Sequence, residues 1–284
     1  MAHSKPRHSA PTSRPPHRPK RRSRPWYQGP TPIIATGAVI AAIVIVLVLL
    51  SRSGSPPSPA PTASAAAAIV DGVTHLDPAS SLGVGAGALK DPLKPTGASA
   101  TRAPDGRIPV TYIGAEYCPY CAAERWSLLV ALSRFGTFSG VELTQSSSTD
   151  IYPNTPTFTL AHASFTSISV DFVAFETADR NGQSLQQPST DAQAALTKYD
   201  TAGSIPFVDI ANLEYAVGSG YLPDVLTGQD WQQIVAQLSN SQFPVAQQVI
   251  GNANWLTAGM CRAGAKSAAC ADSHIQALVT QLGS

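Results

Sequence analysis

Apolar and polar positions divide the chain into one long apolar run near its amino end and, after it, a series of short periodic segments. Residues 32–50 read PIIATGAVIAAIVIVLVLL, which is 19 residues without a charge. A helix of that length spans about 28 Å, close to the hydrocarbon core of a bilayer, which is roughly 30 Å thick. We therefore expect a single transmembrane helix over 32–50.

Beyond residue 68 the pattern becomes that of a folded domain. β-Branched and aromatic stretches alternate with amphipathic ones, such as the helical stripe of Trp231, Ile234, Val235 and Leu238. This order of elements predicts an α/β fold with a mixed sheet flanked by helices. Strands are predicted over 107–115, 141–144, 157–161, 167–176, 205–210 and 214–218, and helices over 122–135, 190–199, 227–239, 245–260 and 274–282.

The segments on either side of the apolar run are patterned differently. Residues 1–31 are rich in Pro, Ser and Arg and are predicted to form a disordered tail. Residues 51–68 are rich in Pro, Ser and Ala, which predicts a semi-extended linker. Residues 69–107 are interrupted by Gly and Pro and predict an irregular lead-in to a domain that we place over 69–284.

The distribution of charge supports the division into a tail, a transmembrane helix and a domain, and it indicates on which side of the membrane each part lies. Residues 1–31 hold eight Lys and Arg and no acid, whereas the rest of the chain holds 11 Lys and Arg against 18 Asp and Glu. Because positive flanks stay on the cytoplasmic side, we expect a cytoplasmic tail and an extracytoplasmic domain at the cell membrane. The acidic domain argues against binding to nucleic acid. A cleaved signal peptide, with small residues at 62–65, is the alternative to an anchor.

Candidate chemistry lies in the run Cys118-Pro119-Tyr120-Cys121, at the junction of a predicted strand and helix. Free N–H groups and the helix dipole stabilise a thiolate at a helix start, and Pro119 suits the first helical position. Cys118 is then the expected nucleophile on a substrate disulfide, and Cys121 the thiol that resolves the mixed disulfide. Half of a zinc site and a structural disulfide are the alternatives.

Two further features bear on this dithiol. A cis bond between Ile205 and Pro206 would turn the chain and bring its backbone beside the cysteines, whereas a trans proline at a strand edge is the ordinary alternative. Glu116 and Glu124 are the nearest carboxylates, and Glu116 is our candidate for moving a proton to or from Cys121. The alternative for Glu124, with Arg125, is a solvated helix face.

The other two cysteines, Cys261 and Cys270, are predicted to form a structural disulfide outside the membrane. Closing that loop stabilises a fold by roughly 3 kcal/mol in the chain-entropy model. A second redox pair that relays electrons to the dithiol is the alternative. The sequence shows no phosphate loop or dinucleotide fingerprint in a fitting context, so no cofactor and no metal is predicted.

The order of a strand, CPYC, a long helix and then IPFVDI resembles the thioredoxin-like superfamily. More narrowly, YIGAEYCPYCAAERWSLLVALSRFGTFSG, STDIYPNTPTF and IPFVDI closely resemble a membrane-anchored thioredoxin-like family known as domain of unknown function 929, over about 76–270. The resemblance implies the nucleophile role for Cys118, the resolving role for Cys121 and the cis-proline role for Pro206. Thioredoxins also carry a buried acid on the strand before the dithiol, and residues 108–115 contain none.

Together these features predict a membrane-anchored thiol–disulfide oxidoreductase that acts on the thiols or disulfides of exported proteins. Oxidation or isomerisation is expected rather than reduction, because a single span carries no electron donor across the membrane. An integral-membrane redox partner is therefore expected as well. The alternative is a non-catalytic adaptor that keeps the fold and holds the cysteines as a permanent disulfide.

Overall fold

The computed structural model describes residues 59–284. The predicted tail, the predicted transmembrane helix and the first part of the predicted linker lie outside the described residues. In the described part, no helix combines the length and the apolar character needed to cross a membrane. The helices are α2 (Ala63–Thr74), α3 (Pro78–Leu82), α4 (Pro119–Ser133), α5 (Thr190–Tyr199), α6 (Trp231–Leu238), α7 (Pro244–Arg262) and α8 (Ser273–Leu282), with 3₁₀ turns η2 (Pro223–Leu226) and η3 (Ala268–Ala271).

The predicted mixed sheet is present, and it has five strands in the order β1-β9-β8-β2-β7. Strand β2 pairs in parallel with β7 and antiparallel with β8, and β8 continues into β9 as an antiparallel hairpin. Two small two-stranded sheets, β3 with β6 and β4 with β5, come from the chain between α4 and β7. The strands are β1 (Lys94–Pro95), β2 (Ile108–Gly114), β3 (Thr137–Ser139), β4 (Glu142–Gln145), β5 (Pro156–Thr159), β6 (Ser164–Thr166), β7 (Val170–Glu176), β8 (Phe207–Ile210) and β9 (Glu214–Val217).

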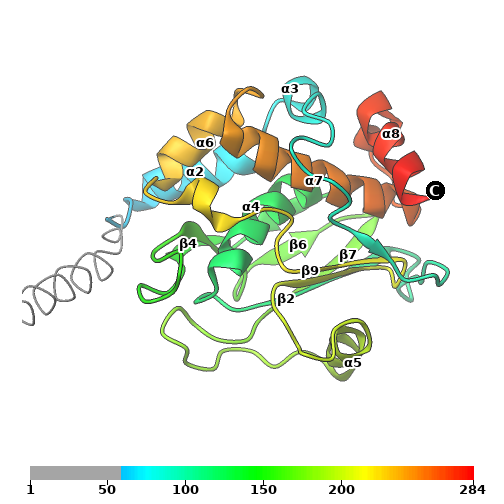
Figure 1. The fold of residues 1–284 in the computed structure, drawn as a ribbon, viewed down its shortest axis with the longest axis horizontal. Helices are drawn as coiled ribbons and strands as arrows, with labels where there is room; N and C mark the ends of the chain where they lie inside the picture. The colour runs from blue at the N-terminus through cyan, green and yellow to red at the C-terminus, as the bar shows by residue number, and fades with distance from the viewer. Residues whose placement is uncertain (1–58) are drawn as a thin grey trace, which may run out of the picture. The chain divides into compact units, whose positions relative to one another are not determined.

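The alternation of β2 explains its central place in the sheet. Ile108, Val110 and Tyr112 are buried together in the larger core, on the face that α4 covers. Ile113 is buried in a smaller core with Leu196 of α5. Figure 1 shows the same arrangement, with α5 on one side of the sheet and most other helices on the opposite side. A strand with both faces covered is apolar almost throughout, as the sequence of β2 is.

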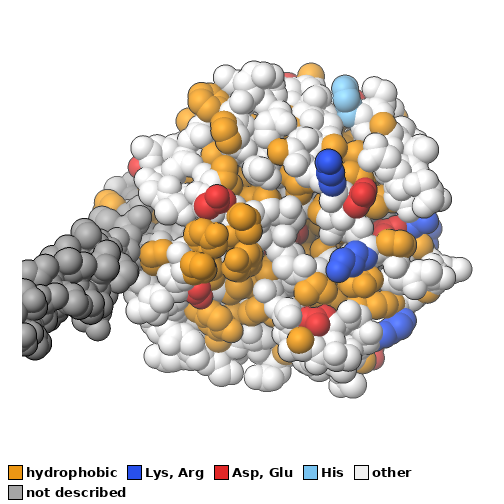
Figure 2. Space-filling view, viewed as in Figure 1, with side chains coloured by type: hydrophobic (Ala, Val, Ile, Leu, Met, Phe, Trp, Pro, Cys, Tyr) orange, Lys and Arg blue, Asp and Glu red, His pale blue; other side chains and the backbone are white. Residues whose placement is uncertain are grey.

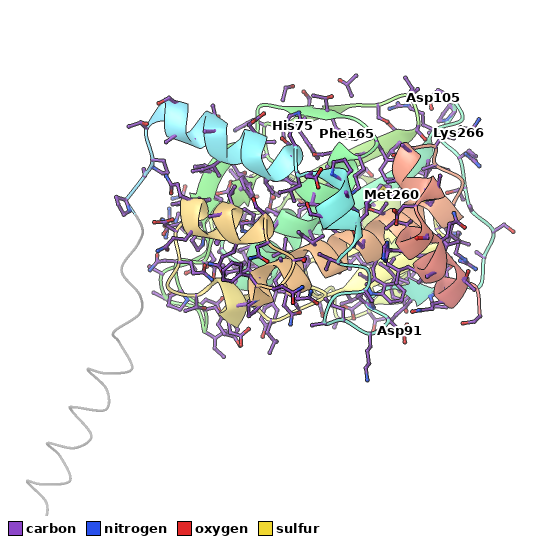
Figure 3. The ribbon with its side chains drawn as sticks, turned by 90° about the horizontal axis from the view of Figure 1, so that it is seen from above. His75, Asp91, Asp105, Phe165, Met260 and Lys266 are labelled. Atoms are coloured by element: carbon purple, nitrogen blue, oxygen red, sulfur yellow. A yellow bond between two sulfur atoms is a disulfide. The ribbon has the colours of Figure 1, made fainter. Side chains whose placement is uncertain are left out.

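Helix α4 is buried along nearly its whole length. Its Trp126 packs edge-on against Phe158 of β5, with ring centroids 4.5 Å apart, and donates its indole N–H to the Pro156 carbonyl at 2.8 Å. Helices α2, α6, α7 and α8 form the outer layer above it, and α2 ends beside the labelled His75 in Figure 3. The helix that carries the dithiol is therefore the centre of the domain.

The predicted irregular lead-in is wrong in part, because residues 63–74 and 78–82 are helical. Thr62 caps α2 by accepting the Ala65 N–H, and Ile69 and Val73 are buried in the main core. Helix α2 thus begins inside the segment that composition assigned to the linker. The short strands β3 and β6 were also missed, since three-residue polar strands carry no usable period.

Candidate active site at the start of helix α4

Gly114 and the three residues after it form the turn that places Cys118 at the top of the sheet. A Cβ on Gly114 would lie 2.0 Å from the hydroxyl oxygen of Tyr112, so a glycine is needed where that ring crosses the strand. The Cys118 N–H donates to the Ala115 carbonyl at 3.2 Å and closes the turn. Cys118 is the N-cap of α4, and its sulfur accepts the N–H of Cys121 at 3.2 Å.

The two thiols have unlike environments. Cys118 is 7% exposed and Cys121 is fully buried, and both are free thiols in this structure. Hydrogen bonds from the thiol and the backbone of Cys121 outweigh burial and lower the pKa of Cys118, and the charge of Arg125 acts in the same direction. Burial, and then the neighbouring Cys118 sulfur, raise the pKa of Cys121 well above the ordinary value. Of the two thiols, Cys118 is therefore the one that ionises more readily, as a nucleophile requires.

A buried ion pair lies behind the dithiol. Arg125 is on α4, four residues after Cys121, and Glu176 ends β7; both side chains are fully buried. The guanidinium donates from Nε to one Glu176 oxygen at 2.7 Å and from Nη2 to the other at 2.6 Å. Burial disfavours the charged guanidinium, but the Glu176 carboxylate outweighs it, and the pKa of Arg125 is raised. The site thus has a buried ion pair near its two sulfurs, and the charge of its guanidinium acts to lower the pKa of both thiols, although burial outweighs it at Cys121.

The interpretation of Glu124 and Arg125 as a solvated helix face is wrong, because Glu124 is buried as well. One oxygen of Glu124 accepts the side-chain N–H of Asn252 at 2.8 Å and the N–H of Gly220 at 3.4 Å. Its other oxygen is buried and has no hydrogen-bond partner. Burial raises the pKa of Glu124 to about 7 despite those two bonds. This group faces α7 and the segment after β9, whereas Arg125 faces the sheet.

Pro206 lies beside the nucleophile. The bond between Ile205 and Pro206 is cis, and the thiol of Cys118 approaches the carbonyl oxygen of Ile205 at 3.9 Å. The N–H of Gly218 donates to the Pro206 carbonyl at 2.8 Å and holds this loop to the end of β9. The structure therefore brings together Cys118, Cys121 and Pro206.

Glu116 precedes the dithiol by two residues and is partly exposed. Its backbone N–H donates to the Ala178 carbonyl at 2.9 Å, which ties the turn to the chain after β7. Among the described residues, the Glu116 carboxylate accepts no hydrogen bond from either cysteine. Its proposed part in proton transfer stays a prediction.

The other cysteine pair lies at the opposite end of the domain. Cys261 and Cys270 form a disulfide between the end of α7 and η3. The Ser267 hydroxyl, three residues before Cys270, donates to the Arg134 carbonyl at the carboxyl end of α4 at 2.6 Å. A 15-residue helix spans about 22 Å, so the length of α4 separates the two pairs.

Sequence reasoning missed Glu176 as a part of this site. The acid is absent from the strand before the dithiol, but the parallel register sets Glu176 of β7 opposite Gly114 of β2. No pattern within β2 could have shown this, because the pairing joins residues far apart in the sequence. Residues 59–284 contain no cluster of three or more His, Cys, Asp or Glu that could hold a metal ion.

Fold and site define an α/β domain with a dithiol at the amino end of a buried helix. Residues 98–201 match the family model described as a domain of unknown function (DUF929), so the expected resemblance to this domain is confirmed over a segment shorter than the predicted 76–270. The matched segment contains the dithiol, Arg125 and Glu176, and it ends before Pro206. No curated protein and no solved structure gives a significant match to the chain.

Proposed function

We propose that this protein is a thiol–disulfide oxidoreductase with a thioredoxin-like domain, tethered to the cell membrane by residues 32–50 and acting on exported proteins. The observation that carries the proposal is the N-cap position of Cys118. Its sulfur accepts the Cys121 N–H, its pKa is lowered, and the second thiol lies buried one turn along the same helix. This difference in pKa and burial between the two thiols is typical of a reactive dithiol and is not required for a structural one.

The topology of the sheet supports the proposed thioredoxin-like fold. A parallel pair β2 and β7, a crossover through α5, and the hairpin of β8 and β9 beside β2 follow the strand order of thioredoxin-like folds. The dithiol follows β2, and a cis proline precedes β8, as the resemblance implies for Cys118 and Pro206. The insertion that carries β3 to β6 is an addition to this plan.

The proposed chemistry balances as a two-step exchange. The Cys118 thiolate attacks a substrate disulfide, forms a mixed disulfide and releases one substrate thiolate. Cys121 then loses its proton and attacks the Cys118 sulfur, which releases the second substrate thiolate and leaves a Cys118–Cys121 disulfide. Oxidation of a substrate dithiol is the reverse sequence. Each net oxidation or reduction of a substrate changes the redox state of the dithiol, whereas an isomerisation returns it unchanged, so an integral-membrane partner that restores the dithiol after net oxidation or reduction belongs to the proposal.

The test is the reduction potential of the Cys118–Cys121 pair in the full-length protein, equilibrated in graded thiol buffers and followed by mass. A potential of about −120 mV indicates an oxidase, and a potential of about −270 mV indicates a reductant. Cys121→Ser should accumulate a mixed disulfide with a substrate protein, and Cys118→Ser should not. A potential far below about −300 mV, without exchange on any disulfide, would instead support a non-catalytic adaptor.

A further inference from the structure

A groove opens beside Tyr117, the residue that precedes the nucleophile. Its volume is about 700 Å³, and three separate segments line it: Tyr117 before the dithiol, residues 147–151 of the loop between β4 and β5, and residues 180–182 after β7. Tyr117 is the chain neighbour of Cys118, so a substrate chain joined to the Cys118 sulfur can reach this groove. Figure 2 shows that hydrophobic side chains gather over part of one face of the described domain.

Hydrogen bonds hold the walls of the groove together. The Ser147 N–H donates to the Tyr117 carbonyl at 2.8 Å and fixes the loop to the dithiol turn. The Arg180 Nη2 donates to the Ser146 carbonyl at 3.1 Å and to the Asn154 side-chain oxygen at 3.0 Å, which joins the third segment to the same loop. The groove is therefore a preformed feature of the fold, and a ligand does not have to assemble it.

The lining mixes exposed apolar and polar groups. Ile151 is 72% exposed and Tyr117 is 36% exposed, so neither contributes much to the core. Ser148, Thr149 and Asp150 are exposed between them. Asp150 and Arg180 give one charge of each sign, so the groove does not select by net charge. Apolar anchors among hydroxyl groups, in an open groove, suit an extended chain better than a small enclosed ligand.

We propose that this groove binds an extended polypeptide segment of the substrate protein, next to the substrate cysteine, with an apolar side chain against Ile151 and Tyr117. This inference rests on the proposed function and specifies its substrate class: polypeptide disulfides rather than small disulfides. The groove increases the rate of exchange by holding the substrate chain near Cys118, and it leaves the chemistry of the sulfurs unchanged.

The experiment compares two disulfides that release the same chromophore, thionitrobenzoate, from the full-length reduced protein. One is a ten-residue peptide with leucines on both sides of a cysteine that carries the chromophore, and the other is the same derivative of free cysteine. In each case the Cys118 thiolate bonds to the cysteine sulfur and thionitrobenzoate leaves. The second-order rate constant is measured for both.

Ile151→Ser should lower the rate constant for the peptide roughly tenfold, since the loss of a few buried methylene groups corresponds to about that factor. The rate constant for the cysteine derivative should change less than twofold. Ser148→Trp, which fills the groove from its exposed rim, should have the same selective effect. Ile168→Ser is the matched control, because Ile168 is 98% exposed and lies before β7, at the other end of the strand.

Equal rate constants for the peptide in Ile151→Ser, Ser148→Trp and the unaltered protein would overturn the groove proposal while leaving exchange itself established. An equal fall for both disulfides would also overturn it, since it would indicate a change at the thiols. Failure of the unaltered protein to react even with the cysteine derivative would instead refute the proposed function, and the groove proposal with it.

Discussion

The buried pair of Arg125 and Glu176 provides the sharpest test of how this fold supports its dithiol. Neither side chain contacts water, and two short hydrogen bonds join them. Arg125→Met leaves a buried carboxylate without its cation, and Glu176→Gln leaves a buried cation without its anion. We expect each single variant to lose about 3–5 kcal/mol of unfolding free energy, the usual cost of an uncompensated buried charge.

The double variant Arg125→Met with Glu176→Gln should recover much of that loss. Removing both charges also removes the cost of keeping them from water, and replacement of a whole buried pair is often close to neutral. Urea unfolding followed by tryptophan fluorescence measures all three variants. Arg107→Met is the matched control, since Arg107 pairs with Asp105 and Asp171 at the surface and should cost less than about 1 kcal/mol.

The same variants separate stability from thiol chemistry. The charge of Arg125 favours the thiolate of Cys118, so Arg125→Met should raise the pKa of that thiol, whereas Glu176→Gln keeps the cation and should not raise it. The rate of alkylation by iodoacetamide as a function of pH reports this pKa directly. Two results would refute the reasoning: single variants as stable as the unaltered protein, or an alkylation profile that Arg125→Met leaves unchanged.

Three further predictions concern neighbouring groups. Burial raises the pKa of Glu124 to about 7, so between about pH 4.5 and 7 the folded state binds more protons than the unfolded state. The free energy of unfolding should therefore fall by up to about 3 kcal/mol as the pH rises through this range. Glu124→Gln should flatten this part of a pH series of urea unfolding. Replacing Cys261 and Cys270 by alanine should cost about 3 kcal/mol by the same measurement yet leave exchange by the dithiol intact. Gly114→Ala should cost about 1–3 kcal/mol, because its Cβ meets the buried ring of Tyr112, and a thermal melt that matches the unaltered protein would contradict this.

Local patterns were enough to predict the elements that form the sheet and its main helices. Helix α5 covers the predicted range 190–199, and β2, β8 and β9 lie within their predicted ranges. These segments have clear periods and end at caps or glycines, so neighbouring residues determine them. Helix α2 was missed because its alanines look like a linker until Ile69 and Val73 are seen packed in the core. That burial depends on tertiary contacts that composition does not show.

The residues of the site also fall into those that the local sequence predicts and those that only tertiary contacts bring in. Cys118 and Cys121 are three residues apart, so one helical turn determines their geometry. Glu176 joins them only through the register of two parallel strands, and Arg125 looks like a surface residue until α7 and the sheet enclose α4. A charged residue on a helix is usually exposed, which made the solvated interpretation the natural one. Arg125 is an exception because α4 is enclosed on nearly all sides and Glu176 pairs with its charge.

The positions of the two cysteine pairs also restrict how the dithiol can be restored. Exchange requires sulfur atoms to approach bonding distance, about 2 Å. The Cys261–Cys270 disulfide adjoins the carboxyl end of α4, and Cys118 caps its amino end, about 22 Å away along a buried helix. No exchange between the two pairs can occur within one folded chain. If the dithiol turns over as proposed, its electrons therefore come from, or go to, a redox partner outside this folded chain.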